Sequence, residues 1–103
     1  MQIVYASRDE VNHFIAKKQA RRMGHDIVPV YREDRLGTHE ANVVIIDLDN
    51  FDGTAQNRQP AQVSAQQVIA HTHRPGTQAA RQLAGLGIPV VARLDRDMFE
   101  MIG

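Results

Sequence analysis

The sequence predicts one α/β domain with three layers, in which helices cover both faces of a five-stranded parallel sheet with the strand order 2-1-3-4-5. Short apolar runs alternate along the chain with segments of helical spacing, which is the pattern of strand–helix–strand units joined by right-handed crossovers. Prolines interrupt the second and the fifth runs, at Pro29 and Pro89. Because proline cannot donate a backbone hydrogen bond to a neighbouring strand, both runs should lie at sheet edges or begin there, as strands 2 and 5 do in this order.

The predicted strands are continuous apolar runs rich in β-branched residues, which is typical of strands covered on both faces. The run Val43–Ile46 contains neither proline nor a polar residue, so we expect it at the centre of the sheet. The five runs span residues 3–6, 27–31, 43–46, 68–70 and 88–92.

A helix is expected between the first two strands. Ser7 and Glu10 have the spacing of a capping box at its start, and Gly24 stands where a helix should stop. Its apolar stripe should consist of Val11, Phe14 and Ile15.

Two further helices are expected in the second half of the chain. The first begins near residue 76 or 77, ends around residue 85 or 87, and should bury Ala79, Ala80 and Leu83. The second begins after Asp95, and its apolar face should consist of Met98, Phe99 and Ile102.

The third crossover, between the third and fourth strands, fits this scheme least well. Residues 50–67 are rich in Gln, Asn, Gly and Pro, and their only large apolar side chains are Phe51 and Val63. The helix expected here is therefore short, beginning near Pro60, or missing altogether.

Composition limits the classes of function. The chain of 103 residues has room for a single domain spanning residues 1–103, and its twelve basic and twelve acidic residues cancel, so we expect neither nucleic acid nor a membrane as a partner. The absence of cysteine excludes disulfides, thiolate zinc sites and cysteine nucleophiles. No run is long enough to cross a bilayer and no secretory signal is present, so we expect a cytoplasmic protein.

Residues 42–53 contain an apolar strand that ends at Asp47, followed by a loop that reaches the pair Asp52-Gly53. This stretch resembles the central strand and following loop of response-regulator receiver domains, which have a flavodoxin-like fold. The resemblance extends over the whole chain. It places Asp47 at the phospho-acceptor position, Thr72 at the switch threonine that follows the fourth strand, and Arg93 near the position of the family's lysine.

The departures from the receiver pattern point to a degenerate pocket. Receivers carry two acidic residues directly after the first strand, which hold a magnesium ion, whereas Ser7 and Arg8 follow it here and the first carboxylate is Asp9. Magnesium prefers several carboxylate and water oxygens in a near-octahedral shell. Without the cation a transferred phosphoryl group lacks its main stabiliser, and the guanidinium of Arg93 does not replace a lysine. We therefore expect no metal, no cofactor and no phosphorylation by the standard route.

Three carboxylates follow the central strand, where open α/β sheets place their ligands. Asp47, Asp49 and Asp52 could form a phospho-acceptor or cation site, or they could accept hydrogen bonds from backbone amides of a polar loop. The missing partner carboxylates favour the loop. Together with Thr72 and Arg93, Asp47 and Asp49 make up the predicted vestigial pocket.

Histidines and arginine follow the fourth strand at the same edge of the sheet. His71 and His73 could bind a metal if Asp47 or Asp49 came near, but a chance His-x-His is common, and contact with a small anion or sensitivity to pH is the simpler interpretation. Residues predicted to contact such a ligand are His71, His73, Arg74 and Ser7, although helix capping also accounts for Ser7.

A basic cluster lies on the first helix. It could dock an acidic partner helix or a phosphate backbone, or it could be a solvated helix face. We favour the solvated face, because the sequence shows no aromatic residues accompanying the cluster and the domain is neutral. The cluster consists of Lys17, Lys18, Arg21 and Arg22.

These observations lead to a pseudo-receiver that is not an enzyme and binds a protein partner in a signalling pathway, with a possible homodimer through the last strand and helix. Two alternatives stay open. One is a functional receiver phosphorylated on Asp47, and the other is a small-ligand or metal-binding enzyme that uses Asp47 with His71 and His73.

Overall fold

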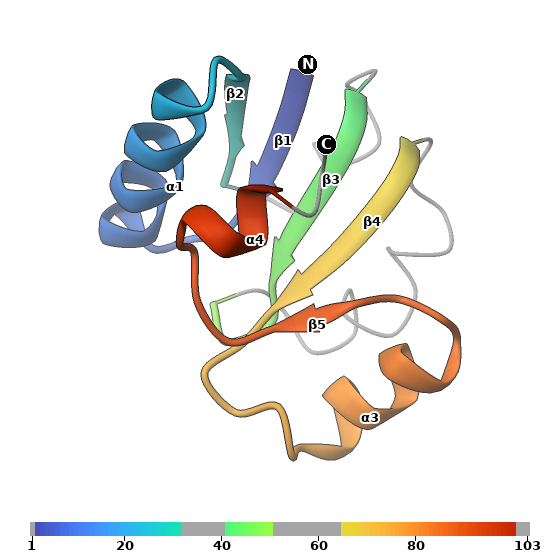
Figure 1. Cartoon of the computed structure of the whole chain (residues 1–103). Coiled ribbons are helices and arrows are strands. Elements are labelled where there is room, and N and C mark those ends of the chain that lie inside the picture. Colours follow the sequence, from blue (N-terminus) through green and yellow to red (C-terminus); the bar gives the residue numbers. More distant parts are fainter. Residues whose placement is uncertain (1, 32–40, 51–64, 101–103) are drawn as a thin grey trace.

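A computed structural model of the chain describes residues 2–31, 41–50 and 65–100. Its elements, in chain order, are β1 (Gln2–Ala6), α1 (Glu10–Arg22), β2 (Asp26–Val30), β3 (Ala41–Asp47), β4 (Ala65–His71), α3 (Gln78–Gly85), β5 (Val90–Val91) and α4 (Arg96–Glu100) (Figure 1). The predicted crossover helix near Pro60 falls outside the described residues, as do Asp52 and Ile102.

The five strands form one parallel sheet with the order β2-β1-β3-β4-β5, which confirms the predicted topology. Pro29 lies in the edge strand β2 opposite Tyr5, and Pro89 directly precedes the short edge strand β5. The proline-free strand β3 is central, as predicted. The two prolines therefore occupy places where a missing N–H costs the sheet little.

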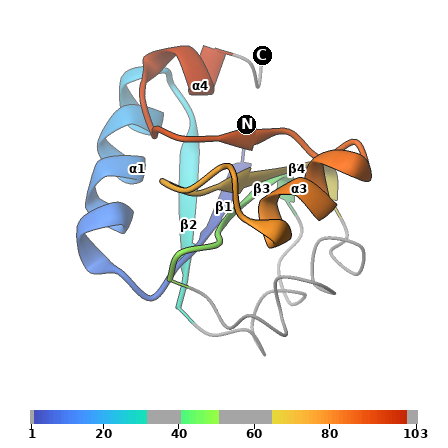
Figure 2. The ribbon, with the colours of Figure 1, turned by 90° about the horizontal axis from the view of Figure 1, so that it is seen from below.

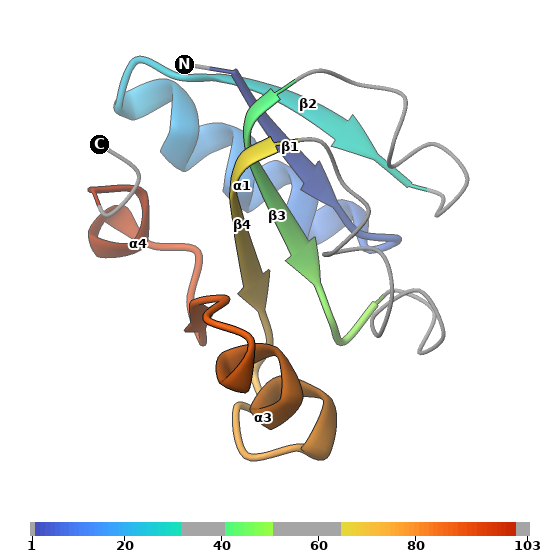
Figure 3. The same ribbon diagram turned by 90° about the vertical axis from the view of Figure 1, so that its right-hand side faces the viewer.

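Helices cover the two faces of the sheet, which gives the predicted three layers (Figures 2 and 3). On one face, α1 and α4 contribute Ala16, Ala20, Met98 and Phe99 to a core with β1, β3 and β4. On the other face, α3 contributes Ala80 and Leu83 to a second core with the same strands.

The helix α1 begins and ends through local hydrogen bonds. Its N-cap is Asp9, whose carboxylate accepts from the backbone N–H groups of Val11 and Asn12. Ser7 was predicted to be the cap, and that prediction is wrong. At the other end, Gly24 has a φ of 77°, and the N–H of His25 donates to the carbonyl of Ala20. This is the Schellman arrangement, which confirms the predicted helix end.

The face that α1 presents to the sheet differs from the predicted one. The predicted apolar stripe is exposed to solvent, with exposed fractions of 65%, 68% and 38% for Val11, Phe14 and Ile15. The two small alanines let the helix approach the sheet closely, and two polar side chains beside them make hydrogen bonds to the site described below. The buried side chains of α1 are Asn12, His13, Ala16 and Ala20.

The later helices agree with their prediction. Thr77 caps α3 by accepting from the N–H of Ala80, and Gly87, with a φ of 84°, ends it in a second Schellman arrangement. Of the side chains predicted to be buried, Ala80 and Leu83 are buried and Ala79 is half-buried. In α4, which begins after Asp95, the side chains of Met98 and Phe99 are buried.

The positive φ of Gly24 predicts a stability difference. A Cβ at this position would meet no atom within 4 Å, so Gly24→Ala is expected to destabilise the fold through backbone strain alone, by about 1 kcal/mol. Gly85→Ala is the matched control, because Gly85 is helical and a Cβ added there would also meet nothing within 4 Å. At this position alanine should stabilise the fold by up to about 1 kcal/mol. Urea denaturation measures both, and equal stability of the two variants would contradict the left-handed backbone at Gly24.

Candidate functional site

The candidate site lies at the edge of the sheet where β1, β3 and β4 end. Parallel strands bring their C-terminal ends to one edge, and ligands of open α/β sheets bind there. Four polar residues at this edge are almost completely removed from solvent: Ser7, Asp47, His71 and Thr72.

Asp47 is the centre of the site, and its side chain has no exposed surface. Its Oδ2 accepts hydrogen bonds from the Oγ of Ser7 at 2.8 Å, the Nδ2 of Asn12 at 2.9 Å and the Nδ2 of Asn50 at 2.8 Å. Its Oδ1 accepts from the backbone N of Asp49 at 3.1 Å. Four neutral donors therefore satisfy a buried carboxylate, which is the condition for burying such a group without a cationic partner.

These contacts set the protonation state of Asp47. Burial raises the pKa of the carboxyl, but the hydrogen bonds from Asn50, Asn12 and Ser7, with a smaller contribution from His71, outweigh burial. The pKa of Asp47 consequently lies below its ordinary value, and the group is an anion at neutral pH.

Ser7 has a structural part in this site that the sequence did not reveal. Its hydroxyl donates to Asp47 and accepts from the backbone N of Asp9 at 3.0 Å. Its carbonyl oxygen lies 2.7 Å from the Nε2 of His13. The residue therefore joins the end of β1 to β3 and α1, and capping does not explain it.

The residues around Asp47 do not fit a magnesium ion. Ser7 and Arg8 stand where receivers carry their acidic pair, and Ser7 directs its hydroxyl hydrogen at Asp47. Asp9, the first carboxylate after β1, caps α1, and the carboxylate of Asp49 accepts from Thr72 and from the backbone N of His73. Within the described ranges, no group of three or more His, Cys, Asp or Glu side chains is placed to hold a metal ion.

A second cluster surrounds the carboxylate of Asp49, whose backbone N–H joins it to Asp47. The Oδ1 of Asp49 accepts from the Oγ1 of Thr72 at 2.6 Å, and its Oδ2 accepts from the backbone N of His73 at 2.7 Å. The hydroxyl of Thr72 also accepts from the backbone N of Arg74. Thr72 thus binds Asp49 rather than Asp47. Beside it lies a hollow of about 540 Å³ lined by Leu48, Asp49, Thr72, His73, Arg74, Thr77 and Ala79.

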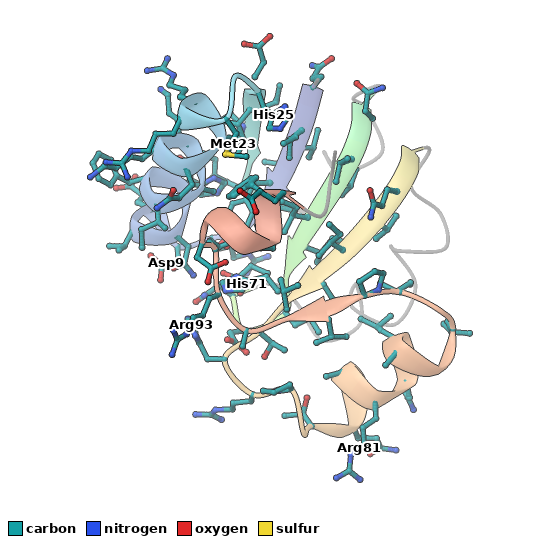
Figure 4. All side chains as sticks on the ribbon, viewed as in Figure 1. Asp9, Met23, His25, His71, Arg81 and Arg93 are labelled. Carbon is teal, nitrogen blue, oxygen red and sulfur yellow. The ribbon has the colours of Figure 1, made fainter. Side chains whose placement is uncertain are left out.

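Arg93 does not join either cluster. It is exposed, it makes no hydrogen bond to Asp47 or Asp49, and its side chain points outward from the segment between β5 and α4 (Figure 4). The predicted pocket of Asp47, Asp49, Thr72 and Arg93 is therefore split into two hydrogen-bonded clusters with Arg93 outside both.

Buried aromatic rings lie beneath the site. The Oη of Tyr5 lies 3.1 Å from the Nδ1 of His71, while the Nε2 of His71 has no hydrogen-bond partner in the described part of the chain. Burial lowers the pKa of His71, partly offset by Asp47, so the ring is neutral at pH 7; burial also raises the pKa of Tyr5. The ring of His13 packs edge-on against Tyr5, with centroids 5.1 Å apart.

Sequence reasoning located Asp47 but missed Tyr5, Asn12, His13 and Asn50. Asn50 carries a local signal, since an amide three residues after a strand-ending aspartate can fold back onto it. Asn12 would be recognised as a donor to Asp47 only if the polar face of α1 were known to lie against the sheet. The hydrophobic pattern of α1 indicated a different rotation of the helix.

Comparisons with known proteins bear on the fold. No family model matches the sequence, and no curated protein sequence matches it. Among solved structures, the receiver domain of a Francisella response regulator aligns with a TM-score of 0.75 at 13% identity, covering 98% of this chain and 92% of that one. A CheY-like receiver domain protein from Methanospirillum hungatei aligns with a TM-score of 0.70 at 14% identity, covering 98% and 89%.

The chain has the fold of a response-regulator receiver domain. A third similar structure, a Burkholderia pseudomallei response regulator, contains a phosphorylated aspartic acid and a calcium ion; its TM-score is 0.70 at 13% identity, covering 96% of this chain and 64% of that one. At identities this low, the structural similarity establishes the fold alone, and this is the fold that the resemblance had predicted. Within the described ranges, no helix has the length and apolar character needed to cross a membrane.

The hydrogen bonds to Asp47 predict a pH-dependent effect of Asn12→Ala. At pH 7 the variant should lose about 1.5–3 kcal/mol, because it removes a buried hydrogen bond to a charged group. Since the pKa of Asp47 is lower in the folded than in the unfolded chain, its ionised form stabilises the fold above about pH 4, and this contribution disappears as the pH falls through the folded pKa. The difference between variant and wild type should therefore shrink at low pH.

Urea denaturation at several pH values measures this effect, with a double-mutant cycle as control. In an Asp47→Asn background, Asn12→Ala should cost markedly less at pH 7, because the partner is no longer charged. Equal costs in the two backgrounds would show that Asn12 acts through packing and not through the carboxylate.

Proposed function

We propose that residues 1–103 form a single pseudo-receiver domain that acts in signalling by binding a protein partner, without phosphorylation and without enzymatic activity. The observation that supports this proposal is the state of Asp47, a fully buried carboxylate whose Oδ2 accepts three side-chain hydrogen bonds. An oxygen in this state is shielded from an incoming phosphoryl group.

Phosphoryl transfer needs a positioned nucleophile and cations that neutralise the developing charge. In the Burkholderia regulator, the phosphorylated aspartic acid is accompanied by a calcium ion. In this chain, the side chains next to Asp47 are hydrogen-bond donors, and Arg93 lies outside the site. Here the hydroxyl of Ser7 and the amides of Asn12 and Asn50 stabilise the negative charge of Asp47 in place of a cation. Asp47 therefore has a structural role.

The alternatives have less support. A receiver phosphorylated on Asp47 would have to expose a carboxylate that has no accessible surface, whose Oδ2 accepts from Ser7, Asn12 and Asn50 and whose Oδ1 accepts from the backbone N of Asp49. A metal-binding enzyme using His71 and His73 would need further ligands beside them, but in the described part of the chain no group of three or more His, Cys, Asp or Glu side chains could hold a metal ion. The Nδ1 of His71 is engaged by Tyr5, and its Nε2 is buried.

The proposal includes a homodimer through β5 and α4, and a cytoplasmic location. Met98 and Phe99 already pack in the domain's own core, so a dimer through this face would use the outer edge of β5 and the exposed residues of the loop that follows it. Light scattering at several protein concentrations tests this part separately.

Phosphorylation chemistry gives the main test. Acetyl phosphate with magnesium should leave the intact mass of the wild-type chain unchanged, and beryllofluoride with magnesium should leave the amide resonances of residues 47–50 unshifted. A phosphorylated species mapped to Asp47 would overturn the proposal.

Restoring the receiver's acidic pair should restore a response to magnesium. The double variant Ser7→Asp/Arg8→Asp places carboxylates beside Asp47, so it should be less stable than wild type without magnesium because like charges repel. Magnesium should then raise its unfolding free energy by about 1.4 kcal/mol when present at tenfold the dissociation constant.

Two controls complete this experiment. The controls are the wild type and the single variant Ser7→Ala, which removes the hydrogen bond to Asp47 without adding charge. Neither should show a magnesium-dependent change in melting temperature. If the wild type were stabilised by magnesium as strongly as the double variant, the residues present would hold the ion and the argument against phosphorylation would fail.

A further inference from the structure

The exposed apolar side chains of the described chain are concentrated on one surface. The exposed large hydrophobic residues are Val11, Phe14, Ile15, Tyr31 and Leu86, and all but Leu86 belong to α1 or directly follow β2. On α1 they lie at positions i, i+3 and i+4, so they form one stripe along the helix. Contiguous exposed apolar groups of this kind mark interaction sites more often than scattered ones do.

Two hollows adjoin this stripe. The first, of about 380 Å³, lies between α1 and the edge strand β2, and Phe14, Ile27, Pro29 and Tyr31 form its apolar walls. The ring of Tyr31 packs on His13 with centroids 4.2 Å apart, and His13 is fixed by its 2.7 Å contact with the carbonyl of Ser7. The wall formed by Tyr31 therefore contacts the Asp47 site through His13 and Ser7, which indicates a preformed surface.

The second hollow, of about 350 Å³, shares Phe14 and Lys17 with the first and is lined by Phe14, Lys17, Lys18 and Arg21. An aromatic ring, Phe14, therefore shares this hollow with three members of the basic cluster, and a second aromatic ring, Tyr31, lines the first hollow together with Lys17. This corrects the prediction that no aromatic residue accompanies the cluster, and with it the reason for treating the cluster as an ordinary solvated face.

Charge identifies the kind of occupant. The helix carries four basic side chains and one acidic one, Glu10. Complementary charge selects partners and suppresses wrong ones, so a partner seated on Phe14 must place carboxylates opposite Lys17, Lys18 and Arg21. An apolar stripe with helical spacing is complemented by the apolar stripe of a second helix.

We infer that the α1 surface, comprising Val11, Phe14, Ile15, Lys17, Lys18 and Arg21 with the adjoining hollow at Tyr31, docks an acidic amphipathic helix of a partner protein. The inference rests on the proposed role in protein binding, but it does not depend on the phosphorylation state of Asp47. The hollow at Tyr31 adjoins the edge strand β2, whereas the homodimer was suggested through β5, which is the other edge of the sheet.

A synthetic peptide tests the inference directly. The probe is a fluorescently labelled, end-capped peptide of about 15 residues with leucine at i, i+3, i+4 and i+7 and glutamate at most other positions. Fluorescence anisotropy should give a dissociation constant of roughly 10–100 µM for the wild-type chain. A peptide with the same composition in scrambled order, and one with lysine in place of glutamate, should bind at least about tenfold more weakly.

Variants assign the binding to the α1 surface. Phe14→Ala and Lys18→Glu/Arg21→Glu should each weaken the peptide at least about tenfold, and because these side chains are exposed the fold should persist. Leu86→Ala is the matched control, since Leu86 is equally exposed but lies after α3; it should bind as wild type does. Asp47→Asn should also bind as wild type does.

Several outcomes would overturn the inference. These are equal binding of the acidic and scrambled peptides, no binding of either, or a loss of binding in Leu86→Ala as large as in Phe14→Ala. A wild-type dimer that Phe14→Ala abolishes would assign the surface to a second copy, and sedimentation with phosphatidylglycerol vesicles that requires Phe14 would assign it to a membrane. Phosphorylation of Asp47 with peptide binding intact would refute the proposed function and leave this inference standing.

Discussion

The buried charge of Asp47 is the constraint on which the rest of the structure depends. An ionised carboxylate in a closed protein interior must be given donors, and here they come from three segments: Ser7 after β1, Asn12 in α1 and Asn50 after β3. The hydrogen bond from Asn12 to Asp47 fixes the rotation of α1 about its axis, and that rotation also buries His13. The same rotation turns the Val11, Phe14 and Ile15 stripe out to solvent. One electrostatic requirement therefore accounts for both the closed pocket and the apolar surface on α1.

The fold could be predicted from the sequence because its signals are local and redundant. Pro29 and Pro89 marked the edge strands, continuous β-branched runs marked the sheet, and Gly24 marked the end of α1. The start of α1 was mispredicted, because the spacing of Ser7 and Glu10 fits a capping box, whereas the structure uses Asp9 as the cap. Placing Ser7 at the end of β1 makes it a donor to β3, which no local pattern encodes.

The site was only partly predictable for a related reason. Asp47 follows from an apolar strand that ends in a carboxylate, but its donors Asn12 and Asn50 are ordinary polar residues until the topology brings them together. The resemblance grouped Thr72 and Arg93 with Asp47. In the structure, Thr72 donates its hydrogen bond to Asp49, and the side chain of Arg93 points away from the site. A comparison at this level of identity transfers the backbone more faithfully than it transfers the contacts of individual side chains.

The distribution of charge over the chain has a kinetic consequence. The molecule has no net charge, yet α1 carries an excess of three positive charges, so the remainder carries an excess of three negative ones. Such a separation makes the protein a permanent electric dipole despite its neutrality. A dipole orients an approaching partner before contact and so raises the encounter rate, and this gain disappears when salt shortens the range of the field. Neutral composition alone would have suggested that long-range forces play no part in its association.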